Sequence, residues 1–271
     1  MTAEEHNAEQ CRTGRWHVPE LPAELRGHGG ASSPLFARAV RRFQGERGLL
    51  VDGKVGPSTL EVCRAASDRV PGTDVSGNNG SLKDAPVCGF RLLADAGLRF
   101  VWVKATEDGT YRFRRCEAWR DAARSAGLRV GAYHFARPGV GDARKEAEWF
   151  GRSVGRHVAG DLPPVLDVEV NPAGLGPDAI RSWCSEWLSA VEALVGRLPV
   201  LYTGTWFWRR AALNVPLWLA QYTSDGREPK SVPGWDWTAW QFSGDSGRVQ
   251  GLDGAFDRNV LERKTFEDRT R

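Results

Sequence analysis

From Gly72 onward, short apolar runs alternate with longer segments in which apolar residues recur every three or four positions. The first pattern is typical of buried β-strands and the second of amphipathic helices. The sequence predicts eight strands, over residues 72–76, 99–105, 128–135, 164–169, 199–203, 217–222, 237–242 and 255–260. It predicts four helices between them, over residues 85–96, 112–126, 142–155 and 177–195.

This alternation of strand and helix predicts parallel strands joined by right-handed crossovers. Eight such strands are enough to close a barrel. The helical pattern fades after Trp208, so we expect the later strands to be joined by short loops. The expected fold is therefore α/β, a TIM-like (β/α) barrel with reduced later helices.

The N-terminal residues follow a different pattern. Residues 1–33 are rich in Pro, Gly and charge and predict no more than one short helix, within residues 18–25. An apolar face between Ser33 and Gly48 predicts a longer helix, and a further short helix follows the breaker Gly56-Pro57. We expect a small helical module ahead of the barrel.

Composition excludes several classes of function. The net charge is only +3, with 10 basic against 9 acidic residues in 1–70 and 27 against 25 in 71–271, so nothing indicates a nucleic-acid-binding face. There is no apolar run of about 18 residues that would span a membrane. The polar N-terminus also lacks the apolar segment of a signal peptide.

The cysteines and histidines indicate neither a metal nor a cofactor. The five Cys show no C-x-x-C spacing and are expected to be reduced, although a bridge between Cys11 and Cys63 stays open. The five His form no paired-ligand motif, and no phosphate-binding G-x-x-x-x-G-K-S/T occurs. His134 is expected in the core, and Lys104 is expected to form a structural ion pair with Glu107.

The most informative chemistry is a pair of carboxylates, Asp167 and Glu169, at the end of the apolar run 162–166. Residues i and i+2 of a strand face the same side, with Cα atoms roughly 6.6 Å apart. Glycosidases use one carboxyl group to protonate the leaving oxygen and a second negative group to stabilise the cationic centre. A strand that simply ends in solvent is the alternative interpretation of the pair.

Two further acids are expected beside this pair if the barrel closes. Asp74 lies in the first predicted strand, and Asp257 lies in the last, which would be its neighbour. Reacting groups of such barrels gather at the carboxyl ends of the strands. Carboxylates that crowd one apolar cup raise the pKa of at least one of them, which predicts an acid-side pH optimum.

Eight successive motifs then resemble one family. They are G-T-D-V-S-G (72–77), F-V-W-V-K-A-T-E (100–107), V-G-A-Y-H-F-A-R-P (130–138), P-P-V-L-D-V-E (163–169), L-Y-T (201–203), L-W-L-A-Q-Y-T (217–223), W-T-A-W-Q-F (237–242) and F-D-R-N (256–259). In this order they resemble the strand motifs of the family-25 glycoside hydrolases, which are lysozymes (N-acetylmuramidases) of bacteria and of phage endolysins. Residues 39–60 resemble the core of peptidoglycan-binding domains.

The resemblance implies a role for each matching residue. Glu169 would be the general acid/base, and Asp167 would orient or charge the acetamido group of the reacting sugar. The other implied catalytic or substrate-binding residues are Asp74 and Asp257 as supporting carboxylates and Tyr133, Tyr202, Trp240 and Gln241 as sugar contacts. The implied domains are a peptidoglycan-binding-like module over 1–70 and a catalytic barrel over 71–271.

The expected function is hydrolysis of the β-1,4 bond between N-acetylmuramic acid and N-acetylglucosamine in bacterial peptidoglycan. The expected partner is the glycan strand, with no nucleic acid, membrane or cofactor, and the protein is expected to be a monomer. Without a signal peptide, it would reach the wall by lysis, a holin-type pore or an unconventional route. Two alternatives stay open: an inactive wall-binding protein and a chitinase-like glycosidase.

Overall fold

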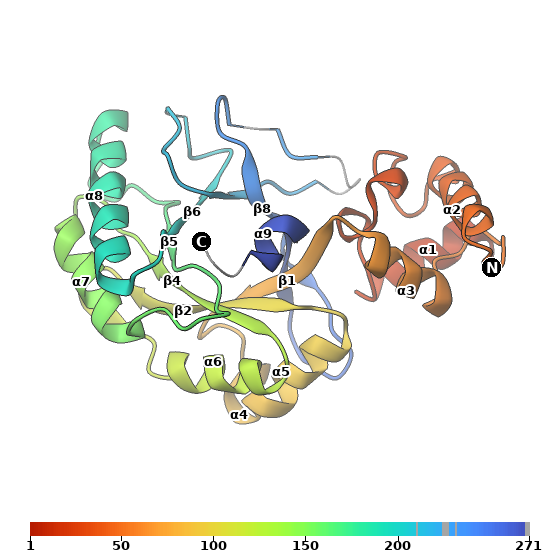
Figure 1. Ribbon diagram of the computed structural model, residues 1–271, viewed down its shortest axis with the longest axis horizontal. Coiled ribbons are helices and arrows are strands. Elements are labelled where there is room, and N and C mark those ends of the chain that lie inside the picture. The colour runs from red at the N-terminus through yellow and green to blue at the C-terminus, as the bar shows by residue number, and fades with distance from the viewer. Residues whose placement is uncertain (210, 224–227, 231, 269–271) are drawn as a thin grey trace.

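A closed barrel forms the centre of the larger part of the molecule, and a small helical part lies at one end (Figure 1). The computed structural model describes residues 1–209, 211–223, 228–230 and 232–268. Within them, the parallel barrel strands are β1 (Arg69–Val75), β2 (Phe100–Glu107), β4 (Arg129–Phe135), β5 (Val165–Asp167), β6 (Val200–Gly204), β7 (Leu217–Ala220) and β8 (Trp237–Gly247). The predicted α/β barrel with a small helical part before it is confirmed.

The last strand, β9 (Phe256–Glu262), closes the barrel and runs antiparallel to both of its neighbours, β8 and β1. The sequence predicted parallel strands, and this is wrong for β9. No helix lies in the described residues between β8 and β9, and a short connection can only return the chain in the opposite direction. A two-residue strand, β3 (Tyr111–Arg112), pairs with the end of β2.

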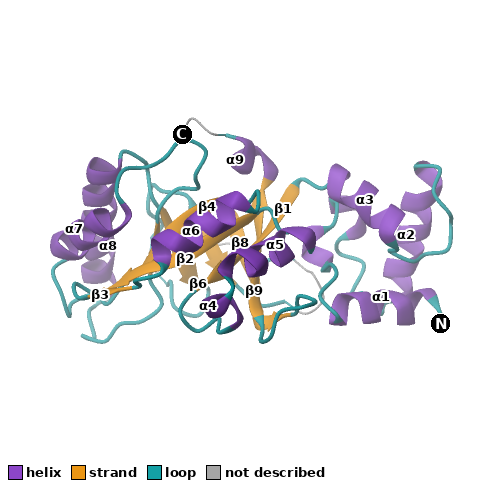
Figure 2. Ribbon diagram, turned by 90° about the horizontal axis from the view of Figure 1, so that it is seen from below, coloured by secondary structure: helices purple, strands orange, loops and turns teal. Residues whose placement is uncertain are grey.

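Helices cover the outside of the first half of the barrel (Figure 2). They are α4 (Ser81–Asp84), α5 (Pro86–Asp95), α6 (Cys116–Ser125), α7 (Ala143–Val154) and α8 (Pro177–Val195). The apolar stripe of α8, with Ile180 and Trp187, is buried, and Gly196 ends the helix in the left-handed conformation at φ 79°. In the described residues no helix follows until α9 (Arg263–Glu267), which confirms that the later crossovers are reduced.

Aromatic side chains fill the interior of the barrel. Trp102 stacks on Trp218 with ring centroids 4.4 Å apart, and Phe100 meets Trp102 edge-on at 5.1 Å. Two glycines leave space for these rings, since a Cβ on Gly72 would lie 2.4 Å from Phe100 and one on Gly131 would lie 2.3 Å from Trp102. The barrel therefore has a solid apolar floor, on which polar groups at the rim are poorly solvated.

His134 and its partners join the barrel to its helical cover. The ring is fully buried, with Nδ1 2.8 Å from Thr106 Oγ1 and Nε2 2.9 Å from Glu146 Oε2 on α7. It also stacks on Trp187 of α8 at 5.3 Å. The prediction that His134 is a satisfied core residue is confirmed.

The N-terminal part contains more helix than the sequence predicted. It consists of α1 (Ala3–Arg12), two 3-10 turns (Val18–Glu20 and Ala23–Leu25), α2 (Pro34–Glu46) and α3 (Pro57–Ala66). The prediction for residues 1–33 missed α1, which begins with a capping box between Thr2 and Glu5. Asn7 is buried on α1 and binds the backbone of Gly53 and Val55, at 2.9 and 2.8 Å.

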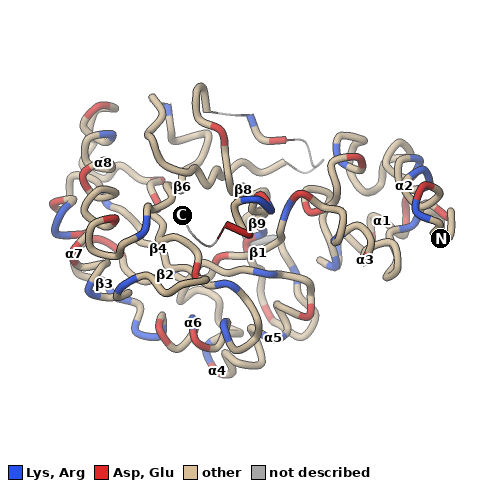
Figure 3. Tube along the Cα trace, viewed as in Figure 1, with Lys and Arg blue, Asp and Glu red and all other residues tan. Residues whose placement is uncertain are grey.

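The helical part packs directly against the barrel wall. Glu20 and Arg258 of β9 form an ion pair that is almost entirely buried. Burial is the largest single influence on the pKa of Glu20 and raises it. The charge of Arg258 and its hydrogen bond to Glu20 lower the pKa, and the net result is a pKa below the ordinary value, so Glu20 stays charged. Arg69 of β1 also donates from Nη1 to the Pro19 carbonyl at 3.2 Å, and the His17 ring lies 5.6 Å from the Phe242 ring of β8. Charged residues elsewhere are of mixed sign over both parts of the chain (Figure 3).

Replacing Glu20 with Gln should destabilise the protein, because it leaves the Arg258 guanidinium buried without its counter-charge. Breaking one side of a buried pair costs about 3–5 kcal/mol. Urea unfolding should therefore show a lower free energy of unfolding for Glu20→Gln. The exposed pair Glu9–Arg12 supplies the control, since Glu9→Gln should cost less than about 1 kcal/mol. Equal, small losses in both variants would contradict the importance of the buried pair.

Candidate active site

A polar cleft of about 430 Å³ opens at the carboxyl ends of the parallel barrel strands. It is lined by Asp74, Ser76, Asn78, Asn79, Gly80, Lys104, Tyr133, Phe135, Asp167, Glu169, Tyr202, Trp218, Tyr222, Gln241, Gly244, Asp253, Gly254, Ala255 and Asp257. The structure thus brings together the four predicted acids and three of the four predicted sugar contacts. It does not bring Trp240 to the cleft.

Asp167 ends β5, and Glu169 follows on a backbone that stays tied to β6. Val168 N–H donates to the Tyr202 carbonyl at 2.9 Å, and Thr203 Oγ1 donates to the Val168 carbonyl at 2.7 Å. Val168 itself is fully buried in the core. Because neighbouring residues of an extended chain face opposite sides, this anchoring turns both carboxyl groups to the cleft.

Asp74 and Asp257 come from the two strands that close the barrel. The register Gly72↔Asn259 places them at the same rim even though β1 and β9 run in opposite directions. Asp74 Oδ1 accepts hydrogen bonds from Asn259 Nδ2 at 2.8 Å and Gln241 Nε2 at 3.0 Å. Burial raises the pKa of Asp74, and the hydrogen bonds, including one with Asp257, oppose that rise.

The central pair is poorly solvated and self-repelling. Burial raises the pKa of Asp167 well above its ordinary value, and the charges of Glu169 and Asp74 add to the effect. Asp167 Oδ1 is buried and has no hydrogen-bond partner among the described residues. Burial also raises the pKa of Glu169, Lys104 lowers it, and Asp257 raises it. The cleft can therefore retain a proton at a pH where free carboxylic acids have lost theirs.

Tyrosines and an amide fix the surroundings of the acids. Tyr202 and Tyr222 both donate to Gln241 Oε1, at 2.8 and 3.1 Å, which turns the Gln241 amide nitrogen toward Asp74. Burial raises the pKa of Tyr133 and Tyr202 well above the ordinary value, and the charges of nearby carboxylates raise it further. Both phenols therefore stay neutral and can donate hydrogen bonds.

Several lining residues were not predicted as part of the site. Trp218 lies 4.6 Å from the Tyr202 ring and donates from Nε1 to Asn259 Oδ1 at 3.0 Å. Asn259 does not line the cleft but binds Asp74, and it could have been found in the sequence, because it follows Asp257 by two positions and shares its strand face. Trp218 and Tyr222 stand in a quoted motif, but the motif alone does not say which of its aromatic residues face the cleft.

Lys104 has two roles, only one of which was predicted. Its Nζ lies 2.6 Å from Glu107 Oε2, so the expected ion pair is confirmed. Glu107 is also bound by Arg137 Nε at 2.8 Å. Lys104 in addition lines the cleft and lowers the pKa of Glu169. It is therefore the basic residue through which the charge of Glu169 is adjusted.

Trp240 is not a sugar contact in this structure. Its side chain is fully buried between Trp237 and Phe242 on the outer face of β8, and its Nε1 donates to the Gln221 carbonyl at 2.7 Å. The strand alternates, so the presence of Gln241 in the cleft forces Trp240 to the other side. The prediction that neighbouring residues would both contact sugar was wrong on this ground.

Cys11 and Cys63 are not joined by a disulfide, so the bridge that the sequence left open is not formed. In the described part of the chain, no group of three or more His, Cys, Asp or Glu side chains is placed to hold a metal ion. No helix among those residues is long and apolar enough to cross a membrane.

Asp167→Asn should make the protein more stable at neutral pH. A carboxyl group whose pKa is raised by folding binds its proton more tightly in the folded state, so its stabilising effect is present at low pH and is lost as the pH rises. Asn cannot ionise, so the variant does not lose this stability as the pH rises. We expect thermal melting of Asp167→Asn to exceed wild type near pH 7 and the difference to shrink near pH 4.

The exposed residue Asp236 provides the matched control, because Asp236→Asn should leave the pH dependence of melting unchanged. A melting difference for Asp167→Asn that is the same at both pH values would contradict the raised pKa.

Comparison with known proteins finds matching family models and similar proteins for both parts of the chain. The family model Glycosyl hydrolases family 25 matches residues 73–252, and a peptidoglycan binding domain model matches residues 27–62. Lysozyme M1 of Streptomyces globisporus is 34% identical over 219 residues, which cover 75% of this chain and 71% of that protein. The N,O-diacetylmuramidase of Chalaropsis sp is 34% identical over 179 residues, covering 58% and 83%. The crystal structure of a bacterial lysozyme from Streptomyces coelicolor superposes with a TM-score of 0.63 at 33% identity, covering 71% and 91%.

Proposed function

The chain belongs to family 25 of the glycosyl hydrolases, and on this premise we propose that it is a lysozyme acting on bacterial cell walls. It hydrolyses the β-1,4 bond between N-acetylmuramic acid and N-acetylglucosamine in peptidoglycan. The observation that carries the proposal is the pair Asp167 and Glu169, which share one cleft and both have raised pKa values. The names of similar proteins, lysozyme and N,O-diacetylmuramidase, support the same substrate.

Glu169 acts as the general acid and then as the general base. It is only partly buried and lines the open cleft, so its carboxyl group can reach a glycosidic oxygen. A general acid works best when its pKa lies near the working pH. Burial and Asp257 raise the pKa of Glu169, and Lys104 limits the rise. The Glu169 carboxyl group can therefore hold a proton and still release it to the leaving oxygen.

Asp167 acts on the substrate rather than on the leaving group. Its side chain lines the cleft and is 8% exposed, which leaves part of the carboxyl group within reach of a bound sugar. The acetamido N–H of the reacting sugar is a donor of the right kind. Accepting that hydrogen bond favours the Asp167 anion and lowers its pKa. The proton that the coupled pair retains then resides on Glu169, where the leaving oxygen can take it.

The remaining polar groups surround Asp167 and Glu169 with oriented charges and dipoles. Asp74 and Asp257 place two further carboxyl groups beside the cationic sugar centre, and the amides of Gln241 and Asn259 keep Asp74 oriented. Tyr133 and Tyr202 supply neutral hydroxyl groups for sugar contacts. All of these residues belong to one chain, so we propose that the monomer is active.

We also propose that residues 1–70 form a wall-binding module and residues 71–271 the catalytic domain. The match of a peptidoglycan binding domain to residues 27–62 supports this division. Complete removal of the module would be an ambiguous test, since it would strip Arg258 of its buried partner Glu20. Point variants distinguish wall binding from stability more clearly.

Glu169→Gln should lower the release of reducing sugar from purified walls by about 10²–10⁴-fold, the usual contribution of general acid–base catalysis. Sedimentation with insoluble walls should show unchanged binding, because the amide keeps the shape of the side chain. The exposed residue Glu148 gives the control variant Glu148→Gln, which should retain full activity. Full activity of Glu169→Gln would exclude the proposed mechanism. Wild-type protein that binds the walls but releases no reducing sugar would instead favour an inactive wall-binding protein.

Lys104→Met should move the alkaline limb of the pH–activity profile to higher pH. Lys104 lowers the pKa of Glu169, so its removal lets the acid keep its proton further up the pH scale. Glu107 keeps Arg137 as a partner in this variant. Measurement of kcat/KM against pH on soluble muramyl oligosaccharides tests the shift. Arg137→Met removes a cation from the same Glu107 and should leave the limb in place. An alkaline limb that shifts to lower pH in Lys104→Met would contradict the role of Glu169 as the general acid.

A further inference from the structure

A second groove, of about 400 Å³, adjoins the catalytic cleft at the junction of the two parts of the molecule. The helical part contributes one wall and the barrel the other. This junction groove is lined by Cys11, His17, Val18, Pro19 and Ala31 on one side and Tyr222, Thr223, Phe242, Ser243 and Gly244 on the other. Tyr222 and Gly244 also line the catalytic cleft, so the two depressions adjoin at these residues.

We propose that the junction groove is an additional binding subsite for the glycan strand, occupied by sugar residues beyond those at the cleavage site. The inference rests on the proposed function, because it assigns more of the same substrate to a second part of the surface. Its consequence is that the N-terminal part takes part directly in substrate selection. A volume of about 400 Å³ is within the range of small-molecule sites, about 300–1,000 Å³.

Tyr222 is the residue that connects the cleft with the groove. Its side chain is 55% exposed, yet its hydroxyl group is fixed by the hydrogen bond to Gln241. Trp206, 48% exposed, lies beside it with ring centroids 5.9 Å apart. A Cβ on Gly244 would lie 2.8 Å from the Tyr222 hydroxyl, so glycine at this position lets the ring lie against β8. An exposed, oriented aromatic ring is a surface on which the apolar face of a sugar can pack.

The chemistry of the groove fits uncharged sugar rings better than the charged peptides of the wall. None of its described lining residues is Asp, Glu, Lys or Arg. Burial lowers the pKa of His17 to about 4 and raises that of Cys11 to about 11, so both are neutral at working pH. His17 lines the groove as a neutral imidazole.

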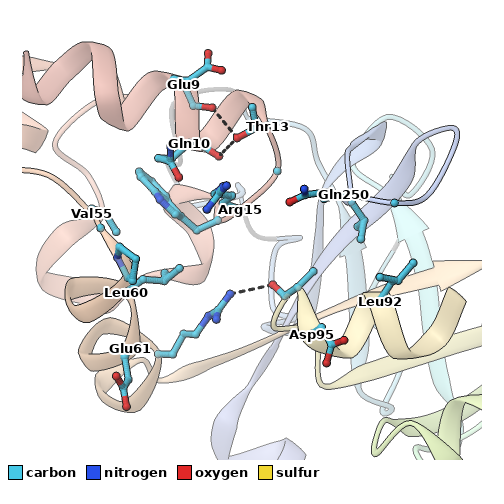
Figure 4. Close-up of a pocket in the computed structure, with 18 of the residues that line it drawn as sticks. Glu9, Gln10, Thr13, Arg15, Val55, Leu60, Glu61, Leu92, Asp95 and Gln250 are labelled. Carbon is cyan, nitrogen blue, oxygen red and sulfur yellow. Dashed lines mark hydrogen bonds between the residues drawn. The ribbon is translucent and has the colours of Figure 1, made fainter. Parts of the chain in front are cut away.

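A larger cavity between the two parts provides the contrast. It measures about 1110 Å³ and lies between α1 and α3 on one side and α5 on the other (Figure 4). Charged side chains of both signs line it, among them Arg15, Glu61 and Asp95. It shares no lining residue with the catalytic cleft. The shared lining residues and the lack of charged side chains therefore favour the junction groove as the path of the glycan.

The groove has a fixed shape because its two walls are joined. Glu20 follows the wall residues His17 to Pro19 and pairs with Arg258 of β9, and the His17 backbone N–H donates to Glu20 Oε2 at 3.1 Å. The His17 ring lies 5.6 Å from Phe242 of the barrel wall. A wall held in this way can discriminate between ligands without first having to be ordered.

The test uses variants that enter the groove from opposite walls, Ser243→Arg from the barrel and Ala31→Arg from the helical part. Ser182→Arg on the exposed surface of α8, at the far end of the molecule, is the matched control (Figures 1 and 2). Peptidoglycan oligosaccharides of two and of four disaccharide units are the substrates. Wild type should prefer the longer one, and each groove variant should lose about tenfold in kcat/KM on it, or 1.4 kcal/mol. The shorter substrate should be unaffected in every variant.

Binding of both oligosaccharides to the Glu169→Gln protein, measured by calorimetry, separates this inference from the proposed function. Tighter binding of the longer oligosaccharide, removed by either groove substitution, supports the subsite even if the wild-type enzyme cleaves neither. Equal affinity and equal kcat/KM for the two lengths would overturn it, as would groove variants that behave like Ser182→Arg. Thermal melting identifies any groove variant that does not fold, and the variant from the other wall then decides the result.

Discussion

The alternation of side chains along β9 is the constraint on which the rest of the structure depends. Asp257 lines the cleft, and Asn259, on the same face of the strand, is buried and binds Asp74 at 2.8 Å. Arg258, between them, points to the outside and pairs with Glu20 of the helical part. The same strand also closes the barrel by pairing with β1 and β8. One strand therefore completes the barrel, the site and the contact between the two parts, so that none of the three can shift independently.

The carboxyl groups of the site are poorly solvated, and this same burial gives them the raised pKa values that acid catalysis needs. Four carboxyl groups share a rim above an apolar aromatic floor, and burial raises the pKa of Asp74, Asp167 and Glu169. Amides and neutral phenols, rather than cations, surround most of this cluster, and Lys104 is the basic residue that lines it among the described residues. A cluster with more cations would be more stable, but its acids would give up their protons before they could serve as catalysts. Such strain is usual where function conflicts with stability.

Much of this arrangement could be predicted from the sequence, and the failures have physical causes. The strand periodicity located eight barrel strands, and the spacing of Asp167 and Glu169 identified the central pair. Periodicity does not encode strand direction, so β9 was expected to be parallel. Helix α1 was missed because its two buried side chains are Ala3 and Asn7, which do not form an apolar stripe, although its capping box was visible at Thr2. Trp240 was misplaced because a motif match was applied to two neighbouring residues without the alternation rule.

The contact between the two parts is the feature least accessible from the sequence. Glu20 lies in a segment rich in Pro and charge, and Arg258 lies in a strand motif, so each alone predicts an exposed side chain. They are buried only because each neutralises the other. A buried pair of this kind contributes less to stability than apolar packing would, but it tolerates only one relative placement of its two partners. It joins the helical wall of the groove beside Tyr222 to β9, and through this wall the helical part can influence which glycan reaches Glu169.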